Sequence, residues 1–173
     1  SVLTDQKYFG GQLEFIQQVK GVVELPVLRK DFIISEYQVW ESFHAGADAI
    51  LLIADAIERE LLQDLYHLAI ELGLHVLIET HNTNHLHWIS DLNPKIIGLN
   101  CRDLAKMETN IAWFEKAIEE LPSGPVWVAE SGIKNYADLQ YISQLGFHAA
   151  LIGSSLMAST SPGLALAKLL QKN

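Results

Sequence analysis

Hydrophobic residues along this chain gather in short, nearly continuous runs that are separated by longer amphipathic stretches. The runs predict seven β-strands, at residues 1–4, 26–30, 49–53, 75–79, 96–100, 126–130 and 149–153. They recur roughly every 20 to 30 residues, which is the length of a strand, a helix and the loops between them. Because the runs are apolar throughout, the pattern indicates strands buried on both faces, as in a parallel sheet covered by helices.

The stretches between the strands have helical spacing and carry signals for helix ends. In chain order these signals are Ser35 with Gln38 as a capping box, Asp55, Gly73 as a stop, Asn110, Asn135, and Ser161 before Pro162. Helices and strands are therefore predicted to alternate over the whole chain.

Two architectures fit this alternation, a doubly wound open sheet and a (β/α)8 barrel. An open sheet of this type usually carries a glycine-rich nucleotide loop after its first strand, and the sequence contains no GxGxxG or GxxxxGK[ST] motif. The barrel is therefore favoured, as one α/β domain over residues 1–173. Such a barrel places its functional groups at the carboxyl ends of its strands.

Polar residues end four of the predicted strands, namely Lys30, Glu79, Asn100 and Glu130. Closure of a barrel would gather an ammonium, two carboxylates and an amide around one opening. A lysine and a glutamate there could divide proton donation from proton removal. A lone lysine at a strand end is otherwise a solvated side chain. Arg29 belongs to the opposite face, where it is expected to pack against helices or to pair with a carboxylate.

The segments after the last two strands, 130–135 and 151–157, have the composition of phosphate-binding loops. Gly132 and Gly153 would let the backbone approach an anion, and Ser131, Ser154 and Ser155 would supply hydroxyls. Glycine and serine could also simply form turns there. Their presence after two consecutive strands favours phosphate.

The loop at 5–11 holds Tyr8 and Phe9 beside Gly10 and Gly11, and could cover an apolar ligand or be a plain connection. The seven histidines lack metal-ligand spacing, and are interpreted as surface or packing residues.

Charge and cysteine content narrow the range of partners. The formal net charge of −9 argues against binding to nucleic acid or to an anionic membrane. The longest apolar stretch is too short to span a bilayer and contains Asp48 and Asp55. Cys101 is the single cysteine of the sequence, which indicates a reduced, cytoplasmic setting without disulfides.

Taken together, the stretches "SVLTDQKYFGG", "PVLRKDFII", "GADAILLI", "LIETHN", "IGLNCRDL", "VAESGI" and "LIGSSLM" give the chain a specific resemblance. The chain resembles the indole-3-glycerol phosphate synthases, a family of (β/α)8 barrels. The resemblance implies a lyase of tryptophan biosynthesis that closes, decarboxylates and dehydrates a phosphorylated small molecule, 1-(2-carboxyphenylamino)-1-deoxyribulose 5-phosphate. It implies neither a cofactor nor a metal.

The resemblance also implies roles for single residues. Lys30 would be the general acid of ring closure, and Glu79 would transfer a proton in the later dehydration. The remaining residues would be Asn100, Glu130 and Ser131 for orienting the substrate, Gly132, Gly153 and Ser154 for phosphate, and Phe9, Phe32 and Leu104 for the anthranilate ring. Cys101 stands where the family often has Asn, with little consequence expected.

The start of the chain departs from the family pattern. Family members begin with a helical extension and a first strand that carries a Glu and a Lys, followed by a Ser-Pro-Ser segment, and the chain has no counterpart of these. We therefore expect an N-terminally truncated chain with about seven of the eight strands, whose partner is the missing N-terminal segment and which alone is inactive or nearly so. The alternatives are another phosphate-binding barrel, such as phosphoribosylanthranilate isomerase, or a catalytically silent scaffold.

Overall fold

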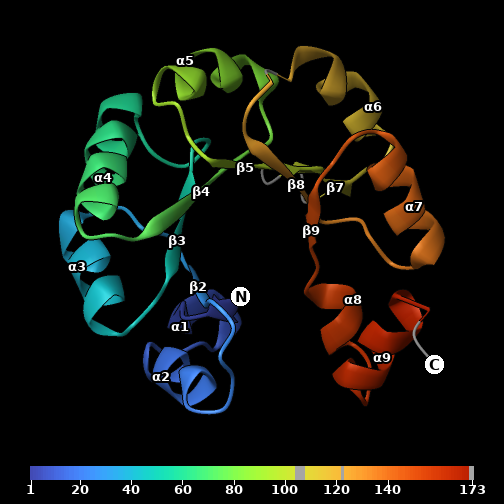
Figure 1. Cartoon of the computed structure of the whole chain (residues 1–173), viewed down its shortest axis with the longest axis horizontal. Coiled ribbons are helices and arrows are strands. Elements are labelled where there is room, and N and C mark those ends of the chain that lie inside the picture. Colours follow the sequence, from blue (N-terminus) through green and yellow to red (C-terminus); the bar gives the residue numbers. More distant parts are fainter. Residues whose placement is uncertain (104–107, 122, 172–173) are drawn as a thin grey trace. The chain divides into compact units, whose positions relative to one another are not determined.

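The computed structural model describes residues 1–103, 108–121 and 123–171. Its contacts divide the chain into two compact units, Ser1–Glu79 and Thr80–Asn173. Each unit is described by itself below, with the element labels of Figure 1.

The first unit is built on parallel strands in the order β1, β2, β3 and β4. Their bounds are β1 Val2–Leu3, β2 Leu28–Lys30, β3 Ala49–Ile53 and β4 His75–Thr80. In β3, Ile50, Leu51 and Leu52 are each at most 1% exposed, so both faces of this strand are buried. This confirms the predicted burial and agrees with the parallel pairing.

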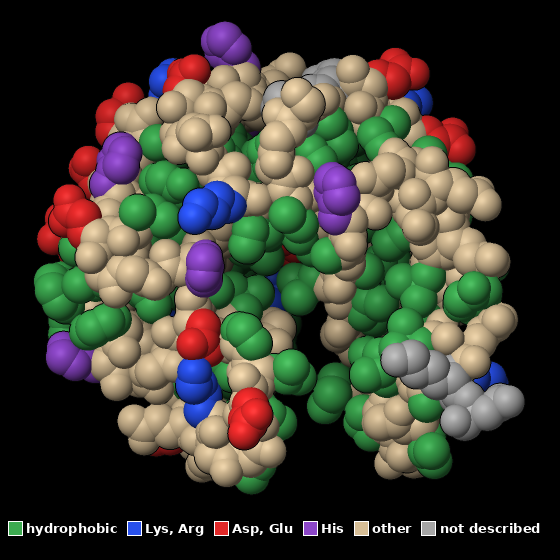
Figure 2. All heavy atoms as spheres, viewed as in Figure 1, with side chains coloured by type: hydrophobic (Ala, Val, Ile, Leu, Met, Phe, Trp, Pro, Cys, Tyr) green, Lys and Arg blue, Asp and Glu red, His purple; other side chains and the backbone are tan. Residues whose placement is uncertain are grey.

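Helices follow β1, β2 and β3 in the first unit. They are α1 Gln6–Phe9, α2 Glu14–Lys20, α3 Glu36–His44 and α4 Arg59–Glu71. Figure 1 shows α3 and α4 next to each other on one side of the strands, and the two helices are in contact. In Figure 2 acidic side chains lie along the edge over α4, where Glu60, Asp64 and Glu71 are exposed. Part of the negative charge of the chain is thus on the solvent side of this helix.

Three local predictions for the first unit were wrong. The segment 5–11 contains the short helix α1, which Asp5 caps through a 2.6 Å hydrogen bond from the Tyr8 N–H. The capping box at Ser35 does not form, because the Gln38 side chain accepts from the Ile34 N–H instead. Helix α4 begins at Arg59, after Glu58 rather than after Asp55.

The second unit holds three parallel strands in the order β5, β8 and β9, with bounds Ile96–Asn100, Val126–Glu130 and Ala149–Leu151. Asn100 is directly opposite Glu130, and Glu130 is opposite Leu151. A separate antiparallel pair, β6 Arg102–Asp103 and β7 Glu108–Thr109, was not predicted. With the first unit, the described residues confirm all seven predicted strands.

The helical elements of the second unit are η1 Thr83–His85, α5 Leu86–Asp91, α6 Trp113–Ala117, η2 Ile118–Glu120, α7 Tyr136–Gln144, α8 Ser154–Met157 and α9 Pro162–Leu169. The predicted cap at Asn135 is confirmed, since Asn135 and Asp138 form a reciprocal capping box. Pro162 opens α9 as predicted. Among the described residues, no helix is both long and apolar enough to cross a membrane.

Candidate functional site

The Lys30 ammonium and the Glu79 carboxylate are in direct contact. The Lys30 Nζ lies 3.3 Å from the Glu79 Oε2, although the two residues are 49 positions apart in the chain. Lys30 is the last residue of β2 and Glu79 lies near the end of β4, so both belong to strand ends. The Glu79 side chain is 3% exposed and that of Lys30 is 29% exposed. An amine that solvent can reach, next to a buried carboxylate, is suited to proton transfer.

Three aromatic rings of the first unit contact one another, and one of them, Phe32, follows Lys30 by two residues. The Phe32 ring is stacked on Phe9, with centroids 6.5 Å apart, and meets Tyr8 edge-on at 6.2 Å. Phe9 and Phe32 are 55% and 39% exposed, so their rings offer an apolar surface to a ligand. Helix α1 carries Tyr8 and Phe9, which gives the predicted aromatic loop a fixed backbone.

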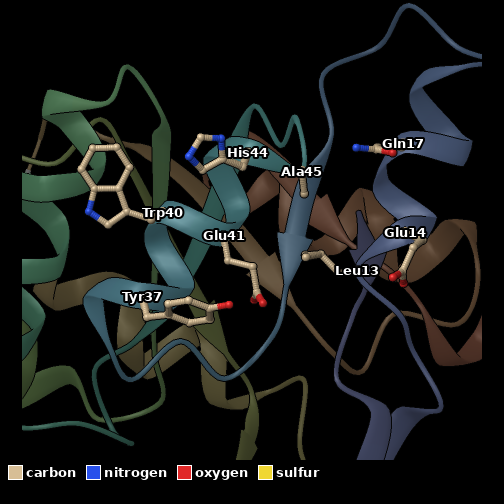
Figure 3. Close-up of a pocket in the computed structure, with 8 residues that line it drawn as sticks. All are labelled: Leu13, Glu14, Gln17, Tyr37, Trp40, Glu41, His44 and Ala45. Atoms are coloured by element: carbon tan, nitrogen blue, oxygen red, sulfur yellow. The ribbon is translucent and has the colours of Figure 1, made fainter.

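Arg29 is buried on the other face of β2, as predicted, and pairs with two carboxylates. Its Nη2 lies 2.9 Å from the Asp31 Oδ2 and 2.8 Å from the Glu41 Oε2. Glu41 also lines an open groove of about 530 Å³ between α2 and α3. Figure 3 shows the Glu41 carboxylate and the Tyr37 hydroxyl pointing into the space beside Leu13. Among the described residues, none of the predicted site residues lines this groove, so it is separate from the Lys30–Glu79 pair.

In the second unit, Asn100 and Glu130 end neighbouring strands and are opposite in register. Both are buried, at 7% and 2% exposure. The Asn100 Oδ1 accepts from the Arg102 N–H at 3.0 Å, and the Asn100 carbonyl lies 2.7 Å from the His81 Nδ1. The His81 ring stacks on Trp113 at 4.7 Å, which confirms a packing role for this histidine.

The loops that follow β8 and β9 adjoin each other. The Ser155 hydroxyl donates to the Ile133 carbonyl at 2.9 Å and so links the two segments predicted to bind phosphate. Ser131 and Gly132 both have positive φ, at 68° and 73°. Glycine adopts this conformation without strain, whereas a non-glycine residue such as Ser131 is strained there, and such strain often marks functional positions. Gly153 caps α8, and both Gly153 and Ser154 are exposed.

The two glycines of these loops have different surroundings, which gives a matched pair of variants. A Cβ at Gly132 would lie 2.9 Å from the Cys101 Sγ in a backbone with φ of 73°, whereas one at Gly153 would meet no atom of the described residues within 4 Å. We expect Gly132→Ala to lower the free energy of unfolding by about 1 to 3 kcal/mol, and Gly153→Ala to leave it nearly unchanged. Urea unfolding of both variants checks this. Equal midpoints would show that the backbone after β8 relaxes freely.

Cys101 is 2% exposed, and burial raises the pKa of its thiol to about 11. We therefore expect a very slow reaction with a thiol reagent at pH 8, which becomes fast after unfolding in urea. Because the pKa is raised in the folded state, the stability linked to this thiol is present below pH 9 and lost as the pH rises towards about 11. Cys101→Ser should remove that part of the pH dependence. Rapid modification of the folded protein at pH 8 would contradict the burial.

The structure places the predicted residues in two groups. In the first unit they are Phe9, Lys30, Phe32 and Glu79, and in the second they are Asn100, Glu130, Ser131, Gly132, Gly153 and Ser154. Leu104 lies outside the described residues. Within the described part of the chain, no group of three or more His, Cys, Asp or Glu side chains could hold a metal ion.

The family model for indole-3-glycerol phosphate synthase matches residues 1–169, nearly the whole chain. The chain belongs to the indole-3-glycerol phosphate synthase family. A synthase of this name from Bacillus velezensis is 48% identical over 162 residues, which are 93% of this chain and 65% of the relative. The synthase from Halalkalibacterium halodurans is 44% identical over 163 residues, 94% of this chain and 63% of the relative. The chain therefore spans slightly less than two thirds of the length of these synthases.

A solved structure supports the fold. The crystal structure of 3-hexulose-6-phosphate synthase from Salmonella typhimurium matches with a TM-score of 0.77 over 99% of this chain and 86% of that chain. At 14% identity this likeness concerns the fold alone. Together with the synthase family match, it confirms the predicted α/β class, with seven strands of a (β/α)8 barrel among the described residues.

Proposed function

We propose that this chain supports the indole-3-glycerol phosphate synthase reaction, the ring-closing carboxy-lyase step of tryptophan biosynthesis. The observation that carries the proposal is the 3.3 Å contact between the Lys30 Nζ and the Glu79 Oε2. This contact provides the proton donor and the proton acceptor that the reaction needs. The family match is a second, independent support. The substrate would be 1-(2-carboxyphenylamino)-1-deoxyribulose 5-phosphate.

Lys30 is assigned the general acid of ring closure. As the ring carbon that carries the carboxylate attacks the ketone carbon, Lys30 gives a proton to the ketone oxygen, which becomes a hydroxyl. Loss of carbon dioxide from the same ring carbon follows and restores the aromatic ring. The hydroxyl then leaves as water together with a proton from the adjacent CH2 carbon, and the C=C bond that forms completes the indole. Glu79, held against the Lys30 Nζ, is assigned proton transfer during this dehydration.

Other residues are assigned to binding. The stacked rings of Phe9 and Phe32 would contact the anthranilate ring through their exposed faces. Asn100, Glu130 and Ser131 would orient the hydroxyls of the substrate. The phosphate would be held by Gly132, Gly153 and Ser154, in loops that the Ser155 hydrogen bond joins.

The experiment is an assay of the complete protein product of the gene with the proposed substrate. Ring closure creates an indole chromophore, so the absorbance should rise with one carbon dioxide released per turnover. A sugar-phosphate isomerase of the same pathway would create no such chromophore, and a silent scaffold would turn over nothing. Absence of indole formation by the folded, complete protein would therefore refute the proposal.

A further inference from the structure

Lys30 is the last residue of a three-residue strand. The registered pairs between β2 and β3 run to Arg29, and Lys30 itself is in register with Leu3 of β1. A side chain at such a position would be loosely held by strand pairing alone. The residues on either side of Lys30, however, are fixed by a buried polar network.

Thr4 contacts three consecutive residues of this segment. Its N–H donates to the Lys30 carbonyl at 3.2 Å, and its hydroxyl donates to the Asp31 Oδ2 at 2.6 Å. The same hydroxyl accepts from the Arg29 Nε at 3.0 Å. Thr4 is 7% exposed, so these hydrogen bonds form away from water, where they hold their geometry most firmly.

The Arg29 guanidinium has acceptors in reach of all three of its nitrogens. Besides the Nε bond to Thr4, the Nη1 donates to the Gln38 carbonyl at 3.1 Å and to the Ser42 Oγ at 3.0 Å. The Nη2 is paired with the carboxylates of Asp31 and Glu41. Because a guanidinium has five N–H donors in a rigid plane, this set of partners allows little movement. Arg29 thereby fixes β2 to helix α3.

Asp31 extends the network to the aromatic rings. Its Oδ1 accepts from the Phe32 N–H at 2.8 Å, while its Oδ2 is bound to Thr4 and Arg29. The Asp31 side chain therefore fixes the backbone directly after Lys30 and also the backbone at Phe32.

We propose that Thr4, Arg29 and Asp31 form a clamp that positions Lys30 and Phe32 for reaction. The clamp acts through the backbone on the face opposite the Lys30 amine, and none of its members is assigned contact with substrate. This inference rests on the proposed function, since it gives the clamp a role in that reaction. Displacing a general acid by about 1 Å can lower the rate of the reaction by up to about 10²-fold.

The test replaces Thr4 in the complete protein product. Thr4→Val keeps the size of the side chain and removes the hydroxyl between Arg29 and Asp31, whereas Thr4→Ser keeps the hydroxyl. We expect Thr4→Val to lower kcat about 10-fold or more with KM changed less than about twofold, and Thr4→Ser to recover most of kcat. Lys20→Met, which removes the exposed ion pair with Asp48, is the matched control and should leave kcat unchanged. All assays are run where circular dichroism shows a folded protein.

The outcomes separate this inference from the proposed function. If Lys30→Ala abolishes indole formation while Thr4→Val keeps the kcat of the unsubstituted protein and only lowers its Tm, the clamp is structural and the inference is wrong. If the unsubstituted protein forms no indole, the proposed function itself fails. Should Thr4→Val not fold, Asp31→Asn is assayed in its place. It removes the charge that Arg29 and Thr4 share, and unchanged kcat in that variant would equally overturn the clamp.

Discussion

Lys30→Ala in the complete protein product should lower kcat for indole formation by about 10² to 10⁴-fold, the range typical of a lost general acid. The amine that would protonate the ketone oxygen is then gone, and water cannot replace it at a fixed position. Because Lys30 is assigned to chemistry rather than to holding the substrate, KM should change much less than kcat. Steady-state indole absorbance with varied substrate concentration measures both quantities.

Two further variants test whether the loss of turnover is specific to the proposed site. Glu79→Gln changes the partner of Lys30, and Lys20→Ala is the control. Glu79→Gln keeps the size of a side chain that is only 3% exposed but removes its ability to accept a proton, so kcat should also fall. Lys20 is another lysine of the first unit, in an exposed ion pair with Asp48 at 2.7 Å, and its replacement should leave turnover unchanged. If both Lys30→Ala and Glu79→Gln retained normal turnover, the assignment of acid and base would be wrong.

The strands could be predicted because burial on both faces leaves a direct trace in the sequence. Each apolar run became a strand, but the bounds differ where pairing ends early. The run at 149–153 became β9 Ala149–Leu151, whose registered pairs stop at Leu151 opposite Glu130. Composition reports that a segment is buried, whereas the end of a strand depends on the hydrogen bonds that its neighbour offers.

Helix starts were less predictable because several partners compete for one polar side chain. Gln38 has the spacing of a capping box with Ser35, yet its amide bonds to the Phe32 carbonyl and the Ile34 N–H. Asn135 and Asp138 have the same spacing, and here the capping box does form. Spacing alone does not distinguish these two cases, since the choice depends on the path of the preceding loop.

The closeness of Lys30 and Glu79 could be predicted, because parallel strands end at the same edge of a sheet and Lys30 and Glu79 both lie at such ends. The network around Thr4 was not predicted. Thr4 lies 25 residues from Arg29, and their contact depends on the register that sets Leu3 opposite Lys30. The only trace in the sequence is a hydroxyl residue at the end of the first apolar run.

Gly11→Ala should destabilise the first unit strongly, because Gly11 is buried and packs directly on β1. A Cβ on Gly11 would lie 2.3 Å from the Leu3 carbonyl oxygen, 2.6 Å from the Leu3 carbonyl carbon and 2.8 Å from the Thr4 Cα. These are backbone atoms of β1 and its end, which cannot rotate away as a side chain would. We expect a loss of about 3 kcal/mol in the free energy of unfolding, measured as a lower urea midpoint at unchanged m-value.

Gly163→Ala is the matched control for this substitution. It adds the same methyl group within α9, where the described part of the chain has no other atom within 4 Å of the added carbon, and should stabilise the helix by up to about 1 kcal/mol. A Gly11→Ala protein with the midpoint of the unsubstituted chain would show that the segment 5–11 does not pack on β1 as described.

If the clash instead shifts β1, it also shifts Thr4, so the kcat of the protein that still folds should fall, as expected for Thr4→Val. Stability and turnover would then fall together, because the close packing of Gly11 on Leu3 and Thr4 supports the clamp that holds Lys30.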